Sequence, residues 1–193
     1  MKKYIVTSIP VGDVKAENVP SLLDKAEIGF EPIANVNWAE AFPCKPNVAF
    51  RMAYAGDKIL LNYQVEEDSV RAVAPADNGR VWEDSCCEFF VSPADDGTYY
   101  NIECNCAGTL LVGFGPGREG RQHLPEDVLQ KVDRWSSLGR QPFDERVGRC
   151  QWQMALVIPT GLFMHHPNLE LQGNEMRANF YKCGDKTQKP HFL

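Results

Sequence analysis

Val81 to Pro93 reads VWEDSCCEFFVSP, and its centre, Cys86 to Val91, is an apolar run typical of a β-strand. One carboxylate, Glu88, lies inside this run, and one indole, Trp82, precedes that carboxylate by six positions. A carboxylate on a central strand is costly to bury unless another group pairs with it. The stretch therefore predicts an interior strand on which Glu88 has either a partner within the protein or a ligand.

Alternating apolar and polar residues recur along most of the chain, at the period-two spacing of β-strands. Residues 48–54 and 59–65 alternate on either side of the Ala-Gly-Asp stretch at 55–57, which predicts a hairpin. Further strands are predicted at residues 86–91, 98–114, 150–159 and 175–183. So many short strands, separated by Gly, Pro and Asp turns, predict an all-β fold, a β-sandwich or jelly roll of antiparallel strands with minor helix.

Helical character is scarce in the sequence. Residues 21–26 predict a short helix, and residues 125–135 predict either a second helix or a loop. The region 113–144 is the least regular and is expected to form excursions from the sandwich. Its glycine-rich start, GFGPGREGR at 113–121, lacks the Lys-Ser/Thr of a phosphate-binding loop, so we interpret it as a turn-rich loop.

The composition limits the class of protein. With 193 residues, 44% of them hydrophobic, the chain is long enough for one domain, and no linker divides residues 1–193. The net charge of −6 argues against binding to nucleic acid or to an anionic membrane. No apolar run approaches the roughly 20 residues of a membrane helix. The start also lacks the apolar core of a signal peptide, which predicts a cytoplasmic protein unless a leader was removed from a secreted or periplasmic one.

The usual catalytic and metal-binding motifs do not occur in the sequence. There is no Cys-x-x-Cys pair, no His-Glu-x-x-His and no Gly-x-Ser-x-Gly, so a zinc site and a serine nucleophile are not predicted. We expect most of the seven cysteines to be reduced, buried and small apolar residues. They are Cys44, Cys86, Cys87, Cys104, Cys106, Cys150 and Cys183.

Carboxylates suggest two weaker hypotheses. Asp84 and Glu88 would lie roughly 13 Å apart on one strand, too far for a glycosidase pair, which leaves only a cross-strand pair of Glu88 with Glu103. The acidic stretches 66–69 and 94–96 could bind calcium through backbone carbonyls, although such stretches far more commonly form turns.

Several predicted strands have one apolar face and one face rich in amides, carboxylates and guanidinium groups. Planar hydrogen-bonding groups beside aromatic rings suit the hydroxyls and CH faces of sugars, whereas the alternative is a simply polar outer face. For Glu88 the alternative is a structural ion pair with Arg51. The polar residues concerned are Arg51, Asn62, Gln64, Glu88, Asn101, Glu103, Asn105, Arg177 and Asn179.

In order along the chain, these stretches resemble the family-9 carbohydrate-binding modules, which occur in xylanases and in many bacterial proteins. The resemblance covers residues 35–183 and is specific only in combination. Its pieces are residues 35–72, VWEDSCCEFFVSPADDGTYYNIECNCAGTLL at 81–111, CQWQMALVIP at 150–159 and MRANFYKC at 176–183.

The resemblance implies a β-sandwich that holds the terminal unit of an oligo- or polysaccharide such as xylan between two aromatic rings, without catalysis. Trp82 matches one ring and Glu88 matches a sugar-bonding carboxylate, while Asn179 lies where the family contributes amides. Arg51, Asn101 and Asn105 are second choices. The residue that supplies the second aromatic ring is not assigned. The candidates are Tyr181, Trp135 and Trp38, and Trp38 is expected to lie inside the sandwich instead.

The resemblance also implies structural calcium in some members, and no other cofactor. Two alternatives to sugar binding stay open. The first is a structural or interaction module whose sugar site has decayed, with Glu88 locked to Arg51. The second is a glycoside hydrolase, which requires two facing carboxylates.

Overall fold

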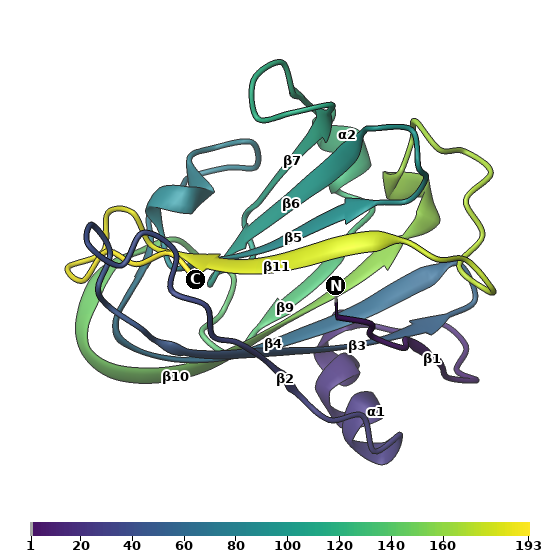
Figure 1. Ribbon diagram of the computed structural model, residues 1–193. Helices are drawn as coiled ribbons and strands as arrows, with labels where there is room; N and C mark the ends of the chain where they lie inside the picture. Colours follow the sequence, from purple (N-terminus) through teal and green to yellow (C-terminus); the bar gives the residue numbers. More distant parts are fainter. Residues whose placement is uncertain (1) are drawn as a thin grey trace.

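The hairpin expected around residues 55–57 forms and begins the larger of two β-sheets in the computed structural model, which describes residues 2–193 (Figure 1). This sheet has the strand order β1-β3-β4-β10-β9, and β2 pairs with the same edge of β3 as β1, nearer the start of β3. Only the β1–β3 pair is parallel. Its strands are β1 (Thr7–Ser8), β2 (Glu31–Ile33), β3 (Asn47–Ala55), β4 (Lys58–Ala72), β9 (Asp133–Ser136) and β10 (Phe143–Pro159).

The second sheet is antiparallel throughout and has the order β11-β5-β6-β7-β8. The predicted strand at 86–91 becomes β5, which lies between two neighbours, so Glu88 is on an interior strand as expected. The strands are β5 (Cys86–Ser92), β6 (Tyr99–Asn105), β7 (Leu110–Gly115), β8 (Gln122–His123) and β11 (Arg177–Cys183). The predicted β-sandwich of antiparallel strands with little helix is confirmed.

The helices are short. The predicted helix near 21–26 forms as α1 (Val19–Lys25), but the second helical prediction was correct only at its start, where α2 spans Glu126–Leu129. Residues 133–136 instead form β9, because they pair with β10 at the edge of the six-stranded sheet. The 3₁₀ turns are η1 (Ala16–Asn18), η2 (Val81–Glu83) and η3 (Thr160–Leu162). Within residues 2–193, none of the helices has the length and apolar character needed to cross a membrane.

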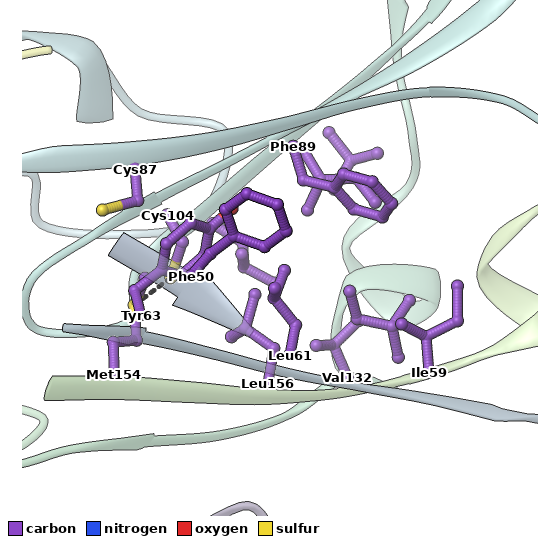
Figure 2. Packing of buried hydrophobic residues seen from close by; sticks show 14 of the residues in the cluster. Phe50, Ile59, Leu61, Tyr63, Cys87, Phe89, Cys104, Val132, Met154 and Leu156 are labelled. Atoms are coloured by element: carbon purple, nitrogen blue, oxygen red, sulfur yellow. Dashed lines mark hydrogen bonds between the residues drawn. The ribbon is translucent and has the colours of Figure 1, made fainter. Parts of the chain in front are cut away.

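The hydrophobic core fills the space between the two sheets (Figure 2). Phe50 and Tyr63 point into it from the six-stranded sheet, and Cys87 and Phe89 point into it from β5. Successive side chains on a strand point to opposite faces. The inward direction of Cys87 and Phe89 therefore places Glu88 on the outer face of the five-stranded sheet.

A second apolar layer covers the other side of the six-stranded sheet. Small residues on the outer face of this sheet, including Ala53 and Ala155, let α1 pack closely through Val19 and Leu23. The outer face of the five-stranded sheet has no such helix over it in Figure 1. The two outer faces of the sandwich are therefore covered differently.

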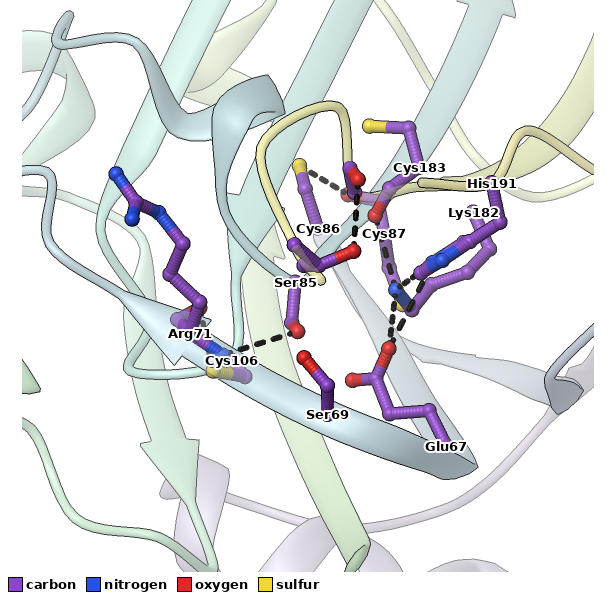
Figure 3. A network of polar contacts seen from close by, with 12 residues as sticks. Glu67, Ser69, Arg71, Ser85, Cys86, Cys87, Cys106, Lys182, Cys183 and His191 are labelled. Carbon is purple, nitrogen blue, oxygen red and sulfur yellow. Dashed lines mark hydrogen bonds and ion pairs between the residues drawn. The ribbon is translucent and has the colours of Figure 1, made fainter. Parts of the chain in front are cut away.

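A buried ionic network closes one end of the sandwich (Figure 3). The ammonium of Lys182, on β11, lies 2.9 Å from Glu67 Oε2, on β4, and 2.6 Å from His191 Nε2. Trp152 Nε1 donates to Glu67 Oε1 at 2.8 Å. This network ties both sheets to the C-terminal segment.

The seven cysteines are all free thiols. Five are buried, as expected, and Cys44 and Cys150 are partly exposed. Burial raises the pKa of the Cys86 and Cys87 thiols well above their usual value, so these side chains stay protonated and behave as small apolar groups.

Candidate functional site

The outer face of the five-stranded sheet carries a row of polar side chains from three neighbouring strands. Glu88 on β5 is directly opposite Glu103 on β6 and directly opposite Tyr181 on β11. Residues directly opposite each other on neighbouring strands share one face of a sheet. In the next row of the same face, Phe90 lies between Asn101 and Asn179.

This face therefore brings together four of the residues predicted from the sequence: Glu88, Asn101, Asn179 and Tyr181. Asn179 Nδ2 donates to the Tyr181 hydroxyl at 2.7 Å, which fixes both groups near the edge of the sheet. Glu103, which the sequence suggested as one of the polar strand residues and as a cross-strand partner of Glu88, completes the row.

Glu88 and Glu103 are both buried, with 5% and 6% of their surface exposed. Glu88 Oε1 accepts a hydrogen bond from the Cys183 thiol at 3.0 Å, and Glu103 Oε1 accepts one from Asn101 Nδ2 at 2.6 Å. Burial raises the pKa of Glu88, and burial together with the charge of Glu88 raises the pKa of Glu103 to about 8. The pair therefore differs from ordinary surface carboxylates, which are ionised at neutral pH.

Arg121 reaches this face from the loop between β7 and β8. Its Cδ would lie only 3.5 Å from a Cβ on Gly113, so the absence of a side chain at Gly113 makes room for the arginine. The guanidinium lies 5.9 Å from the Phe90 ring and 5.8 Å from the Tyr99 ring. Sequence reasoning interpreted the segment 113–121 as a turn-rich loop, which is correct, but it did not single out Arg121.

Three polar atoms in this part of the face are buried and have no hydrogen-bond partner among residues 2–193. They are Asn101 Oδ1, Glu103 Oε2 and Arg121 Nη1. Nearly all buried polar side-chain atoms in proteins are hydrogen-bonded. Two acceptors and one donor are thus left without a hydrogen bond beneath this face, each almost fully buried.

Aromatic rings flank the polar row. Trp82, on η2, and Phe192, near the C-terminus, both pack on an apolar cluster that includes Cys86, Leu111 and Cys183 of the same face. The backbone amide of Asp185 also donates to the backbone oxygen of Trp82 at 3.2 Å. The indole is therefore anchored to the end of the sheet that carries Glu88.

A chain of ring contacts continues from Phe192 along the edge of the sheet. The Phe192 ring centroid is 5.4 Å from Tyr181 and 4.8 Å from Trp38. Trp38 is 63% exposed, so the expectation that it lies inside the sandwich was wrong. Its backbone has a φ of 51°, and the turn that follows it holds the indole outside the core against Phe192.

Two of the predicted residues, Trp135 and Arg51, lie away from this face, and a third, Asn105, shares it opposite Cys86 but is engaged in hydrogen bonds within the protein. Trp135, on β9, packs with Val157 on the outer layer of the six-stranded sheet, so it cannot face Trp82. Asn105 is fully buried, and its Oδ1 accepts hydrogen bonds from Ala107 N at 3.1 Å and Thr109 N at 2.9 Å, which stabilise a turn.

Arg51 belongs to the other sheet, and the predicted Arg51–Glu88 ion pair does not form. Arg51 is 4% exposed beneath α1, where its Nη1 donates to Asp24 at 2.6 Å and its Nε donates to Asn62 at 3.0 Å. The side chains of Arg51 and Glu88 point away from the core on opposite sides of the sandwich. Arg51 is therefore withdrawn from the candidate site.

The two acidic stretches considered for calcium are occupied by partners within the protein. Residues 66–69 lie within β4 rather than in a turn, and Lys189 pairs with Asp68 there at 2.5 Å. Asp96 pairs with His166 at 3.1 Å. Across residues 2–193, no three or more His, Cys, Asp or Glu side chains gather in a way that could hold a metal ion. Structural calcium stays a prediction from the resemblance, and these residues do not fit it.

Comparison with known proteins identifies the family. Residues 17–193 match the family model of Carbohydrate-binding family 9, and the chain belongs to this family of non-catalytic binding modules. The resemblance noted at residues 35–183 is thereby confirmed. No protein in the comparison with curated proteins matches the chain.

Solved structures support the same assignment. A candidate carbohydrate-binding protein from Bacteroides uniformis ATCC 8492 is 53% identical, with a TM-score of 0.94 over 97% of this chain and 86% of that one. A family-9 module from Caldicellulosiruptor kristjanssonii in complex with cellotriose is 11% identical, with a TM-score of 0.52 over 94% of this chain and 76% of that one. The same module in complex with glucose is 12% identical, with a TM-score of 0.50 over 94% of this chain and 78% of that one. At these identities the Caldicellulosiruptor module is similar in fold alone.

Proposed function

We propose that this protein binds the end of an oligo- or polysaccharide on the outer face of the five-stranded sheet. Trp82 stacks on a sugar ring, and Glu88, Glu103, Asn101 and Arg121 hydrogen-bond its hydroxyls. The observation that carries this proposal is the group of buried polar atoms without protein partners, Asn101 Oδ1, Glu103 Oε2 and Arg121 Nη1, beside aromatic side chains.

The chemistry of these groups suits a sugar better than an ion or an apolar ligand. A hydroxyl donates one hydrogen bond and accepts two, so neighbouring hydroxyls satisfy a carboxylate, an amide oxygen and a guanidinium together. An aromatic ring over the apolar face of a pyranose adds an estimated 0.5–1.5 kcal/mol beyond the burial of area. Phe192 and Tyr181 are the candidates for a second aromatic contact, because their rings adjoin on the same face at 5.4 Å.

The known ligands of the related module guide the choice of sugars. The Caldicellulosiruptor module was solved with cellotriose and with glucose. Gluco-oligosaccharides are therefore the first ligands to test, and xylo-oligosaccharides the second, since the family resemblance also implies xylan.

Two other functions find less support. Glu88 and Glu103 do face each other, but both rise from adjacent strands of one sheet face. A glycosidase requires its two carboxylates to flank the scissile bond. The hypothesis of a structural module with a decayed sugar site required an ion pair between Glu88 and Arg51. Arg51 pairs with Asp24 instead.

Calorimetric titration of the intact protein with glucose, cellobiose, cellotriose and the matching xylo-oligosaccharides tests the proposal, with and without calcium. We expect at least one of these sugars to bind. Trp82→Ala should weaken that binding about tenfold, which corresponds to about 1.4 kcal/mol. Trp135→Ala is the matched control, because Trp135 lies on the opposite side of the sandwich, and it should leave affinity unchanged. Binding that survives Trp82→Ala in a folded protein would overturn the proposed site.

A further inference from the structure

Glu88 and Glu103 differ from the other buried acidic residues of this protein. Glu67 lies 2.9 Å from Lys182, and Asp84 lies 3.3 Å from Arg71. Neither Glu88 nor Glu103 forms an ion pair with any of residues 2–193, although both are more than nine-tenths buried. Since a buried carboxylate without a counter-charge is costly, this pair requires another means of neutralisation.

Their positions make the problem more acute. Glu88 and Glu103 are directly opposite on adjacent antiparallel strands, where Cβ atoms lie about 4.5–5.5 Å apart. Two negative charges at this separation in a poorly solvated patch repel each other, so one carboxyl keeps its proton.

The surrounding elements present both signs of charge to the pair. Asp185, in the C-terminal loop, adds negative charge, whereas Arg121 and Arg118, in the loop between β7 and β8, add positive charge. Cys183 on β11 donates its thiol proton to Glu88. The other titratable groups near the pair are the Cys86 thiol on β5 and the Tyr63 hydroxyl on β4, whose pKa values burial raises well above their usual range, and the Tyr181 hydroxyl on β11. The arginines act from beyond ion-pair distance and do not replace a bonded cation.

We propose that Glu88 and Glu103 share a single proton at neutral pH, held mainly on Glu103 Oε2, and that this proton is donated to a hydroxyl of the bound saccharide. The second part rests on the proposed function. The hydrogen bonds favour this placement, because Glu88 Oε1 and Glu103 Oε1 both accept from protein donors at 3.0 and 2.6 Å. Glu103 Oε2 is buried and has no hydrogen-bond partner among residues 2–193, so it can carry the proton without losing an existing hydrogen bond.

Because binding uses the shared proton, saccharide affinity should fall at alkaline pH. Burial and the charge of Glu88 raise the pKa of Glu103 to about 8, so the proton leaves as the pH rises beyond that value. The ligand hydroxyl then faces two ionised carboxylates and loses its donor. Affinity should accordingly be constant near pH 6 to 7 and fall by up to about tenfold for each pH unit above the pKa of the pair.

The proton itself is tested in the free protein, without any sugar. Carbon-13 NMR of the glutamate carboxyls, followed from pH 4 to pH 10, should resolve one carboxyl that titrates above pH 7. Glu103→Gln should remove that titration, and Glu88→Gln should move the remaining carboxyl of the pair below pH 7. Glu119→Gln, on an exposed residue of the nearby loop, is the control and should change nothing. If every carboxyl of the wild-type protein titrates below about pH 5.5, the shared proton is refuted.

The use of the proton is tested by calorimetry with cellobiose, or with the best ligand of the panel, between pH 6 and pH 9.5. The amide of Glu103→Gln supplies a permanent N–H donor, so the affinity of this variant should change by no more than about threefold between pH 6 and pH 9.5. Over the same range the affinities of the wild type and of Glu119→Gln should fall at least tenfold. A flat wild-type profile overturns this inference and leaves the proposed function standing. A high carboxyl titration in a protein that binds no saccharide at any pH overturns the proposed function, and with it the role given to the proton.

Discussion

Lys182 on β11 and Glu67 on β4 form an ion pair across the two sheets, with 2.9 Å between Nζ and Oε2. Both side chains are almost completely buried, at 0% and 3% exposure. The lysine ammonium also donates to the Cys183 carbonyl at 2.9 Å and contacts His191 at 2.6 Å. This pair joins the sheets at the end of the sandwich nearest Glu88 and holds the segment that carries Phe192.

Removing the lysine should be strongly destabilising. Lys182→Met leaves Glu67 buried without its counter-charge, and we expect a loss of about 3–5 kcal/mol in the free energy of unfolding. Urea denaturation monitored by tryptophan fluorescence measures this loss. Lys186→Met, on the exposed loop nearby, is the matched control and should stay within about 0.5 kcal/mol. A loss below about 1 kcal/mol for Lys182→Met would mean that Glu67 is not dependent on this pair.

His191 should remain neutral well below its usual pKa. Burial and the adjacent Lys182 ammonium lower its pKa to about 3. Nε2 faces the ammonium at 2.6 Å and so must accept, while Nδ1 donates to the Lys189 carbonyl at 2.9 Å. The native state therefore binds fewer protons here than the unfolded chain, so the contribution to stability is complete above pH 6.5 and is lost as the pH falls toward 3. Nitrogen-15 NMR should report the neutral Nδ1–H tautomer at pH 5, and an imidazole that titrates near pH 6.5 would contradict this.

Arg51 and Arg121 should give opposite phenotypes. Arg51→Ala breaks charged hydrogen bonds beneath α1, and we expect a loss of about 1.5–3 kcal/mol in stability with saccharide affinity unchanged. Arg121→Ala removes the donor with no protein partner, so it should weaken saccharide binding about tenfold and change stability little. Denaturation and calorimetry on both variants measure this. Loss of saccharide binding by a folded Arg51→Ala protein would contradict the proposal, because it would place the ligand on the six-stranded sheet.

Phe192 is the test of the second aromatic contact. Its ring lies 4.8 Å from the exposed Trp38 ring and packs on the same apolar cluster as Trp82. Phe192→Ala should weaken saccharide binding about fivefold, whereas Phe192→Tyr should retain it, because the aromatic face is kept. Calorimetry compares the two variants, and equal affinities for both would remove Phe192 from the site.

Much of the fold could be predicted from the sequence, because alternation along a strand reports which face a residue occupies. The apolar run at residues 86–91 predicts the interior strand that carries Glu88, and the alternation on either side of residues 55–57 predicts the hairpin. Alternation also puts Lys182 in the interior, next to the inward Phe180, so the buried network left a signal in the sequence. A lysine is rarely buried without a partner, so the alternation alone did not lead us to predict a buried Lys182. Its partner, Glu67, is over one hundred residues away in the chain and could not be identified from the sequence.

The site was predictable only in part, for a different reason. Alternation assigns a residue to a face but does not say which sheet the face belongs to. Arg51 and Glu88 both lie on outer faces, yet on opposite sides of the sandwich, so their predicted pairing failed. Arg121 lies in a loop and Phe192 lies in the C-terminal segment. Neither segment has a periodic hydrophobic pattern, so only the packing of these segments on the sheet places the two residues at the site.

The most direct test asks which face of the sandwich a saccharide contacts. Amide proton–nitrogen NMR spectra of the wild-type protein, titrated with cellobiose or the best ligand of the panel, locate the contact residue by residue. We expect the largest shifts in β5, β6 and β11, around Glu88, Glu103 and Tyr181, and in the C-terminal segment. Shifts concentrated instead on α1 and the outer face of the six-stranded sheet, or at the surface cavity lined by Pro93, His166 and Asn174, would contradict the site proposed for this protein.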